Sequence, residues 1–149
     1  MIKSTPRYQT VFALSIFLFM LFGSFFLLLD SLLNNPQYFI IKLILTPLVL
    51  VIGLLILNKL IASVKIIEAG NSQLRVFHPI SRKRIKLPIK EIKGWQEEVV
   101  KTKNGEFRET KILYGKKNII KLSNKENTAY EKIVKYLSQK AAKQRVKTK

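Results

Sequence analysis

The N-terminal part of the chain contains two apolar blocks of equal length. The first, VFALSIFLFMLFGSFFLLL over residues 11–29, has no charge, and the second, FIIKLILTPLVLVIGLLIL over residues 39–57, has one, Lys42. At 1.5 Å per residue, each block is long enough as a helix to cross a hydrocarbon layer of about 30 Å. The pattern predicts two membrane-spanning helices, and the short polar link over residues 30–38 predicts that the second runs back beside the first.

Two features of these blocks allow other interpretations. Lys3 and Arg7 precede the first block, as in a cleaved signal peptide, but the block exceeds a usual signal core and no small-residue cleavage pattern follows it. Lys42 is either a residue that snorkels its ammonium into the headgroups or a transport residue. We favour an uncleaved span and a snorkelling Lys42.

After residue 57 the pattern changes to a two-residue alternation, which is typical of half-buried strands. In RIKLPIK, residues 84–90, apolar and cationic side chains alternate and would face opposite sides of a strand. Asn104-Gly105 predicts a type I′ turn between two long hairpin arms. The six predicted strands cover residues 64–68, 73–77, 84–90, 95–102, 107–114 and 119–122.

An amphipathic helix is predicted to follow these strands. Ser123 and Glu126 have the spacing of a capping box, and Tyr130, Ile133 and Leu137 recur on one helical face. This helix would supply apolar cover for an open end of a curled sheet.

Several stretches together resemble the bacterial pleckstrin-homology-like (PH-like) domains, which often follow a pair of membrane helices. They are IEAGNSQLRVFHP, RKRIKLPIKEIKGW, the hairpin around KNGE and the helix KENTAYEKIVKYLSQ. The resemblance covers residues 62–140 and implies a partly open, seven-stranded β-barrel capped by a C-terminal α-helix. Because six strands are predicted, either a long hairpin arm is broken in two or the linker after Leu57 contributes a strand.

Pattern and resemblance together predict an α+β membrane protein in three parts. Residues 1–60 would form the transmembrane helical hairpin, residues 61–140 a cytoplasmic PH-like domain and residues 141–149 a basic tail. Residues 58–149 hold 24 of the 27 basic and 8 of the 9 acidic side chains. Basic residues flank the outer ends of the apolar blocks and the link has none, so the positive-inside rule predicts a multi-pass protein of the cell (inner) membrane with both termini in the cytoplasm.

Residue types exclude several chemistries. The chain has no cysteine and one histidine, His78, expected at a strand end, which excludes disulfides and thiolate metal sites and argues against a histidine cluster. Glu97 and Glu98 would face opposite sides of a strand, and Trp95 is expected in the core. No catalytic motif is found, so we expect no enzyme activity, no cofactor and no metal.

Cationic side chains are the remaining candidates for function. Each Lys or Arg near an anionic leaflet contributes about 1 kcal/mol, and a membrane tether keeps the contacts local. The loop over residues 69–72 has no cation, so the phosphoinositide pocket of the resembled family is not expected. The predicted contacts with anionic lipid or a partner are Arg75, Arg82, Lys83, Arg84, Lys86, Lys140, Lys143, Arg145 and Lys147.

The stretch over residues 140–149 is either a solvated basic extension or a frayed helix end. The predicted function is a membrane-anchored interaction module that docks a protein partner or the anionic inner leaflet, with homo-oligomerisation left open. The alternative, a membrane-tethered nucleic-acid-binding protein, is weaker because topology already requires these cations and no aromatics interleave with them.

Overall fold

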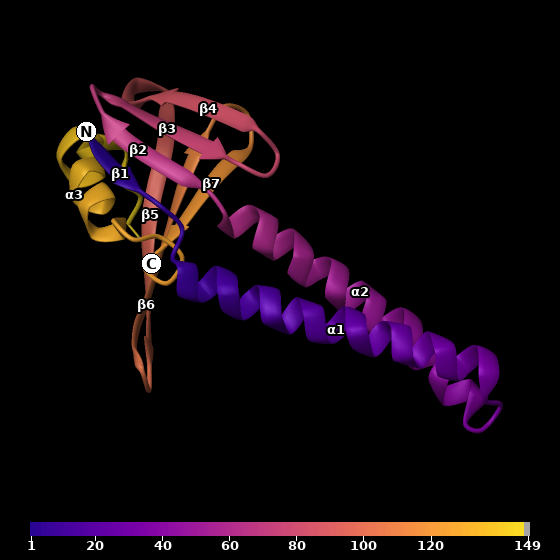
Figure 1. Ribbon diagram of the computed structural model, residues 1–149. Coiled ribbons are helices and arrows are strands. Elements are labelled where there is room, and N and C mark those ends of the chain that lie inside the picture. Colours follow the sequence, from indigo (N-terminus) through magenta and orange to yellow (C-terminus); the bar gives the residue numbers. More distant parts are fainter. Residues whose placement is uncertain (148–149) are drawn as a thin grey trace. The chain divides into compact units, whose positions relative to one another are not determined.

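The computed structural model describes residues 1–147 and divides into two compact units (Figure 1). One unit is Tyr8–Ser63, and the other combines Met1–Arg7 with the chain from Val64 onward. The second unit is therefore discontinuous in sequence, because the chain leaves it after residue 7 and returns at residue 64.

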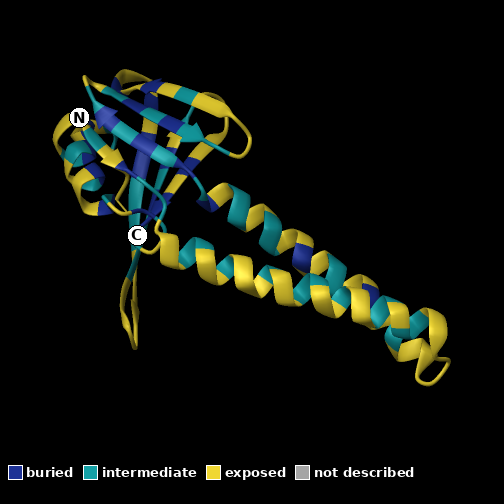
Figure 2. Cartoon of the chain, viewed as in Figure 1, coloured by how far each residue is buried: buried dark blue, intermediate teal, exposed yellow. Residues whose placement is uncertain are grey.

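The first unit is a pair of helices, α1 (Tyr8–Asn34) and α2 (Phe39–Ser63). Both are long and apolar enough to cross a membrane, as predicted, and both extend beyond the apolar blocks. Most of their side chains are exposed (Figure 2). The helices approach closely at Gly53, where an added Cβ would lie 3.7 Å from the Phe22 ring.

Lys42 joins the two helices. Its Nζ donates hydrogen bonds to the carbonyl oxygens of Ser31 at 3.3 Å and Asn35 at 3.1 Å. These carbonyls lie at the C-terminal end of α1, where a cation is favourable; the Ser31 carbonyl also accepts a bond from Asn35 N at 3.1 Å. Lys42 therefore has a structural role that the sequence did not indicate.

The second unit contains two antiparallel sheets and a C-terminal helix, α3 (Tyr130–Lys140). The sheets have the orders β1-β2-β3-β4 and β5-β6-β7, and they do not form a closed barrel. Short 3-10 turns occur at Ile89–Glu91 and Ala142–Gln144. The strands are β1 (Ile2–Ser4), β2 (Ile66–Gly70), β3 (Gln73–His78), β4 (Lys83–Pro88), β5 (Ile92–Thr102), β6 (Gly105–Tyr114) and β7 (Asn118–Ser123).

The described chain has seven strands, one more than predicted, and the additional strand is β1 at the N-terminus. Its residues pair antiparallel with β2, in the register Ile2 with Ala69 and Ser4 with Ile67. The two predicted sources of a seventh strand, a broken hairpin arm and the linker after Leu57, are both wrong. Three residues directly before an apolar helix are too few to show an alternation.

The last residue of β1 and the segment of three residues after it are hydrogen-bonded to the loop between β7 and α3. Ser4 Oγ accepts a bond of 3.1 Å from the backbone N–H one residue before α3. Thr128 N donates to the Thr5 carbonyl at 3.0 Å, and Arg7 N donates to the Glu126 carbonyl at 2.8 Å. Residues 4–7, the N-terminal strap, therefore bridge the first sheet to the loop that follows the second.

The core lies on the inner faces of the two sheets and under α3 (Figure 2). The predicted alternation is confirmed within β4, where Leu87 is buried while Arg84 and Lys86 are exposed, but the strand ends at Pro88 and the buried Ile89 lies in the 3-10 turn that follows. Trp95 is a core residue, as expected, with 1% of its surface exposed. The buried apolar residues are Ile67, Ala69, Leu74, Val76, Leu87, Ile89, Ile92, Trp95, Ile112, Ile120, Leu122, Tyr130, Ile133, Leu137 and Ala141.

The hairpin turns differ from the prediction. Gly105 has a φ of 114°, but Asn104 is not among the residues with positive φ, so the predicted type I′ turn at Asn104-Gly105 is wrong. Lys103 and Asn104 form the loop, and Gly105 begins β6 opposite Thr102. Two consecutive positive φ values occur instead between β2 and β3, at Asn71 (48°) and Ser72 (55°).

The start of α3 also differs from the prediction. The helix begins at Tyr130, not next to the predicted capping box at Ser123. Ser123 Oγ does accept a hydrogen bond from Glu126 N at 3.2 Å, but Ser123 N donates to Asn127 Oδ1 at 3.2 Å. These bonds close a local turn before the helix, whose predicted buried face is confirmed.

Trp95 holds the segment that follows α3 against β5. Its Nε1 donates to the Ala141 carbonyl at 2.8 Å, and its own carbonyl accepts from Val146 N at 2.8 Å. The Arg145 guanidinium lies 5.2 Å from the centroid of the indole. The backbone of residues 141–146 is therefore attached to β5 and is not a frayed helix end, although most side chains of residues 142–147 are exposed. Residues 148–149 of the predicted tail lie outside the described chain.

We expect Trp95→Phe to lower the free energy of unfolding by about 2 kcal/mol, because it leaves a void and removes the bond to Ala141. Denaturant unfolding of the full chain in detergent micelles measures the change. Val99→Ala, at a side chain that is 49% exposed, is the control and should change the value by less than about 0.5 kcal/mol. Equal effects of the two substitutions would contradict the role of Trp95.

Candidate ligand-binding face

A row of four charged side chains crosses the outer face of the first sheet. Lys3 on β1 pairs with Glu68 on β2, Glu68 pairs with Arg75 on β3, and Arg75 pairs with Lys86 on β4. Cross-strand partners project from the same face of a sheet. Their neighbours along each strand contribute to the core, so this row faces outward.

A second row on the same face supplies apolar surface. Ile66 pairs with Phe77, and Phe77 pairs with Arg84, whose guanidinium lies 5.1 Å from the centroid of the phenyl ring. The two rows line a depression of about 410 Å³. We call this surface the outer basic face, and its side chains are Lys3, Ile66, Glu68, Arg75, Phe77, Arg84 and Lys86.

The outer basic face carries four cations and one carboxylate. Among residues 1–147, the cations in ion pairs closer than 4.0 Å are Arg108 and Lys111, both on β6. The positive charges on the first sheet are therefore not neutralised by ion pairs. An anionic ligand entering the depression would meet several of them together.

The structure brings three of the predicted cations together on this face, all from β3 and β4. It adds Lys3, which sequence reasoning missed because no pattern indicated β1. Arg82 lies in the turn between β3 and β4 with a φ of 53°, and Lys83 begins β4. Neither of these two lines the depression.

The predicted cations near the C-terminus form a separate group. Lys140 ends α3 and Lys143 lies in the turn after it. Arg145 and Lys147 line a different hollow of about 390 Å³ together with Glu97. These residues therefore do not extend the outer basic face.

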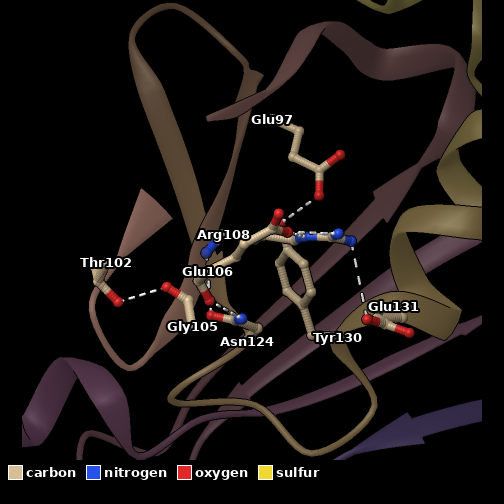
Figure 3. A network of polar contacts seen from close by, with 8 residues as sticks. All are labelled: Glu97, Thr102, Gly105, Glu106, Arg108, Asn124, Tyr130 and Glu131. Atoms are coloured by element: carbon tan, nitrogen blue, oxygen red, sulfur yellow. Dashed lines mark hydrogen bonds and ion pairs between the residues drawn. The ribbon is translucent and has the colours of Figure 1, made fainter. Parts of the chain in front are cut away.

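A polar network fastens α3 to the second sheet (Figure 3). The Tyr130 hydroxyl lies 2.7 Å from Thr110 Oγ1 and donates to Glu97 at 3.0 Å. Burial raises the pKa of this hydroxyl, so it stays protonated as a donor. Arg108 lies 3.9 Å from Glu131 on α3. The network is a structural contact between sheet and helix.

Glu97 and Glu98 face opposite sides of β5, as predicted. Glu97 contacts the Tyr130 hydroxyl, whereas Glu98 accepts bonds of 2.9 Å from Lys111 on β6. The two carboxylates therefore do not act as a pair.

Lys65 directly precedes β2 and His78 ends β3 as expected, and their strand neighbours Ile66 and Phe77 are paired. Lys65 is 6% exposed, and burial lowers its pKa while the nearby Glu126 partly opposes the shift. Burial, followed by the charges of Lys65 and Lys83, lowers the pKa of His78. The Nδ1 of His78 is buried without a hydrogen-bond partner in the described chain.

Comparisons with protein-family models, with curated proteins and with solved structures find no match to this chain. Its class is therefore defined by the observed architecture alone. It is a mixed α+β protein in which two long apolar helices are inserted between the first and second strands of a two-sheet domain.

Lys65→Met should raise the pKa of His78 toward its ordinary value of 6.5, because it removes a nearby positive charge. His78 is the one histidine of the chain, so its NMR resonance needs no assignment. A titration of the full chain in detergent micelles measures the pKa. Lys140→Met is the control and should leave the pKa unchanged; an unchanged value in Lys65→Met would contradict the proximity of the two residues.

The same shift predicts a pH dependence of stability. The folded-state pKa of His78 is lower than the unfolded value of 6.5, so the unfolded chain takes up this proton first as the pH falls. His78 should therefore make the free energy of unfolding decrease as the pH drops below about 6.5. Measuring the free energy of unfolding at several pH values below about 6.5 gives its change with pH. The part of this change that is due to His78 should be smaller in Lys65→Met and absent in His78→Gln.

Proposed function

We propose that this chain is a membrane-anchored interaction module. In this proposal α1 and α2 span the cell membrane with both termini in the cytoplasm, and the two-sheet domain is PH-like. The outer basic face docks an anionic partner at the cytoplasmic surface of the membrane. The observation that carries the proposal is the convergence of Lys3, Arg75, Arg84 and Lys86 on one hollowed face.

The surface of the helices supports membrane insertion. The most apolar window of α1 is 0% buried and that of α2 is 11% buried, whereas a helix in the core of a soluble protein is mostly buried. Exposed apolar side chains cover both helices, and lipid would satisfy them. The basic residues at the outer ends, with none in the link, favour cytoplasmic termini.

The order of elements supports the PH-like assignment. Within residues 62–140, six antiparallel strands followed by a C-terminal helix agree with the order that the sequence resemblance implies, while the seventh strand, β1, lies before the two apolar helices. Two of the resembling stretches, the one around KNGE and KENTAYEKIVKYLSQ, contain the hairpin turn before β6 and the final helix α3.

The outer basic face is better suited to an acidic protein segment than to a uniform anionic surface. Glu68 lies between Lys3 and Arg75 and would repel an evenly charged leaflet. A protein segment can place carboxylates against the cations and an apolar side chain on Ile66 and Phe77. We therefore propose a protein partner with acidic residues around an apolar one, in preference to the inner leaflet.

The test uses the full chain in nanodiscs of neutral lipid and a fluorescent peptide of glutamates flanking one leucine. Arg75→Glu with Arg84→Glu should weaken binding at least tenfold, because two attractive contacts become repulsive. The control, Lys116→Glu with Lys117→Glu, makes the same charge change at exposed positions after β6 and should bind nearly as wild type.

Three outcomes would contradict this proposal. Equal losses of peptide affinity in the two double variants would show that the peptide is attracted by the net charge of the chain and not by the outer basic face. Binding to vesicles of phosphatidylserine, but not to the peptide, would assign the face to the leaflet. Tight binding to duplex DNA alone would favour the membrane-tethered nucleic-acid-binding alternative.

A further inference from the structure

The two connections between the helices and the folded domain are short. Arg7 is hydrogen-bonded to the loop before α3, and α1 begins at the next residue. On the other side two residues separate α2 from β2, and one of them is the buried Lys65. Neither connection contains a glycine: the residues are Thr5, Pro6 and Arg7 in the first and Val64 and Lys65 in the second.

These connections lead into neighbouring strands. The strap links α1 to β1, and the second connection links α2 to β2. β1 and β2 are held together over three residue pairs. A displacement of α1 relative to α2 must therefore act on this short ladder or on the hydrogen bonds of the strap.

The outer basic face is divided by the same ladder. Lys3 comes from β1, whereas the other side chains of the face come from β2, β3 and β4. We infer that binding at the outer basic face is coupled to the position of α1, because docking of β1 supplies Lys3 and withdrawal of β1 removes it. This inference rests on the proposed function of that face.

Thermodynamic linkage makes the coupling reciprocal. A ligand that contacts Lys3 stabilises the docked β1 strand, and a change that lowers the docked fraction of β1 weakens ligand binding in proportion to that fraction. The apparent affinity for the ligand is the affinity of the form with β1 docked, multiplied by the fraction of molecules in that form.

Ser4 allows docking to be changed without changing the binding surface. Its side chain is 0% exposed and faces away from the outer basic face, with Oγ accepting a bond from Ala129 N. Ser4→Ala removes this bond but keeps all four cations. Ser138→Ala is a matched control, because it removes a hydroxyl bonded to the Val134 carbonyl within α3.

The first experiment measures affinity for the same glutamate-leucine peptide in neutral nanodiscs. Ser4→Ala should weaken binding by up to about fivefold through a smaller docked fraction, and Ser138→Ala should not change it. The peptide should also slow amide hydrogen exchange over residues 2–5 in the wild type. Equal affinity in Ser4→Ala and wild type, without slower exchange, would overturn the coupling.

A second experiment tests the link to α1 directly. Nanodiscs with short and long acyl chains change helix tilt through hydrophobic mismatch. The affinity of the wild type should differ between them, and insertion of Gly-Ser-Gly-Ser between Arg7 and Tyr8 should abolish the difference. A wild-type affinity independent of thickness would overturn the inference, as would a dependence that survives the insertion.

The two proposals fail in different ways. If the wild type does not bind the peptide in any nanodisc, the proposed function is wrong and the coupling falls with it. If the wild type binds and loses affinity in the double variant at Arg75 and Arg84, but Ser4→Ala and bilayer thickness have no effect, the binding face stands and the coupling is wrong.

Discussion

The antiparallel pairing of β1 with β2 joins the two chain segments that flank the apolar helices. Three residues at the N-terminus thereby become the edge of a four-stranded sheet whose other strands begin after residue 65. The strap continues this attachment to the loop before α3, so the N-terminal segment contacts both halves of the domain. A fragment that starts after α2 would lack this edge strand, the strap and Lys3.

The insertion also determines what the domain can do. Because its chain passes to the helices at two places, a membrane hairpin would hold the domain by two covalent connections and keep the outer basic face at high local concentration beside the membrane. Trp95 and the Tyr130 network fasten the second sheet, α3 and the following segment to one another. The outer face of the first sheet presents four cations, none of them in an ion pair within residues 1–147, together with Glu68 and the apolar side chains of Ile66 and Phe77.

Long or repeated patterns could be read from the sequence, and features made by few residues could not. The apolar blocks predicted α1 and α2, and the alternation over residues 84–90 predicted which cations of β4 share a face. Lys3 was missed because β1 is too short to show an alternation. Ser123 fits a capping pattern in the sequence, but in the structure its hydrogen bonds close a turn before the helix. The basic composition after residue 140 gave no indication that Val146 N donates to the Trp95 carbonyl.

Disulfide formation between Lys3→Cys and Glu68→Cys tests the central claim, that the N-terminal strand pairs with β2 of the same chain. The chain contains no other cysteine, and cross-strand partners lie within disulfide reach. Mild oxidation in isolated membranes should yield a monomer with an internal disulfide, whereas Lys3→Cys with Glu91→Cys should stay reduced. Failure of the first pair to cross-link, or its cross-linking only between chains, would contradict the account.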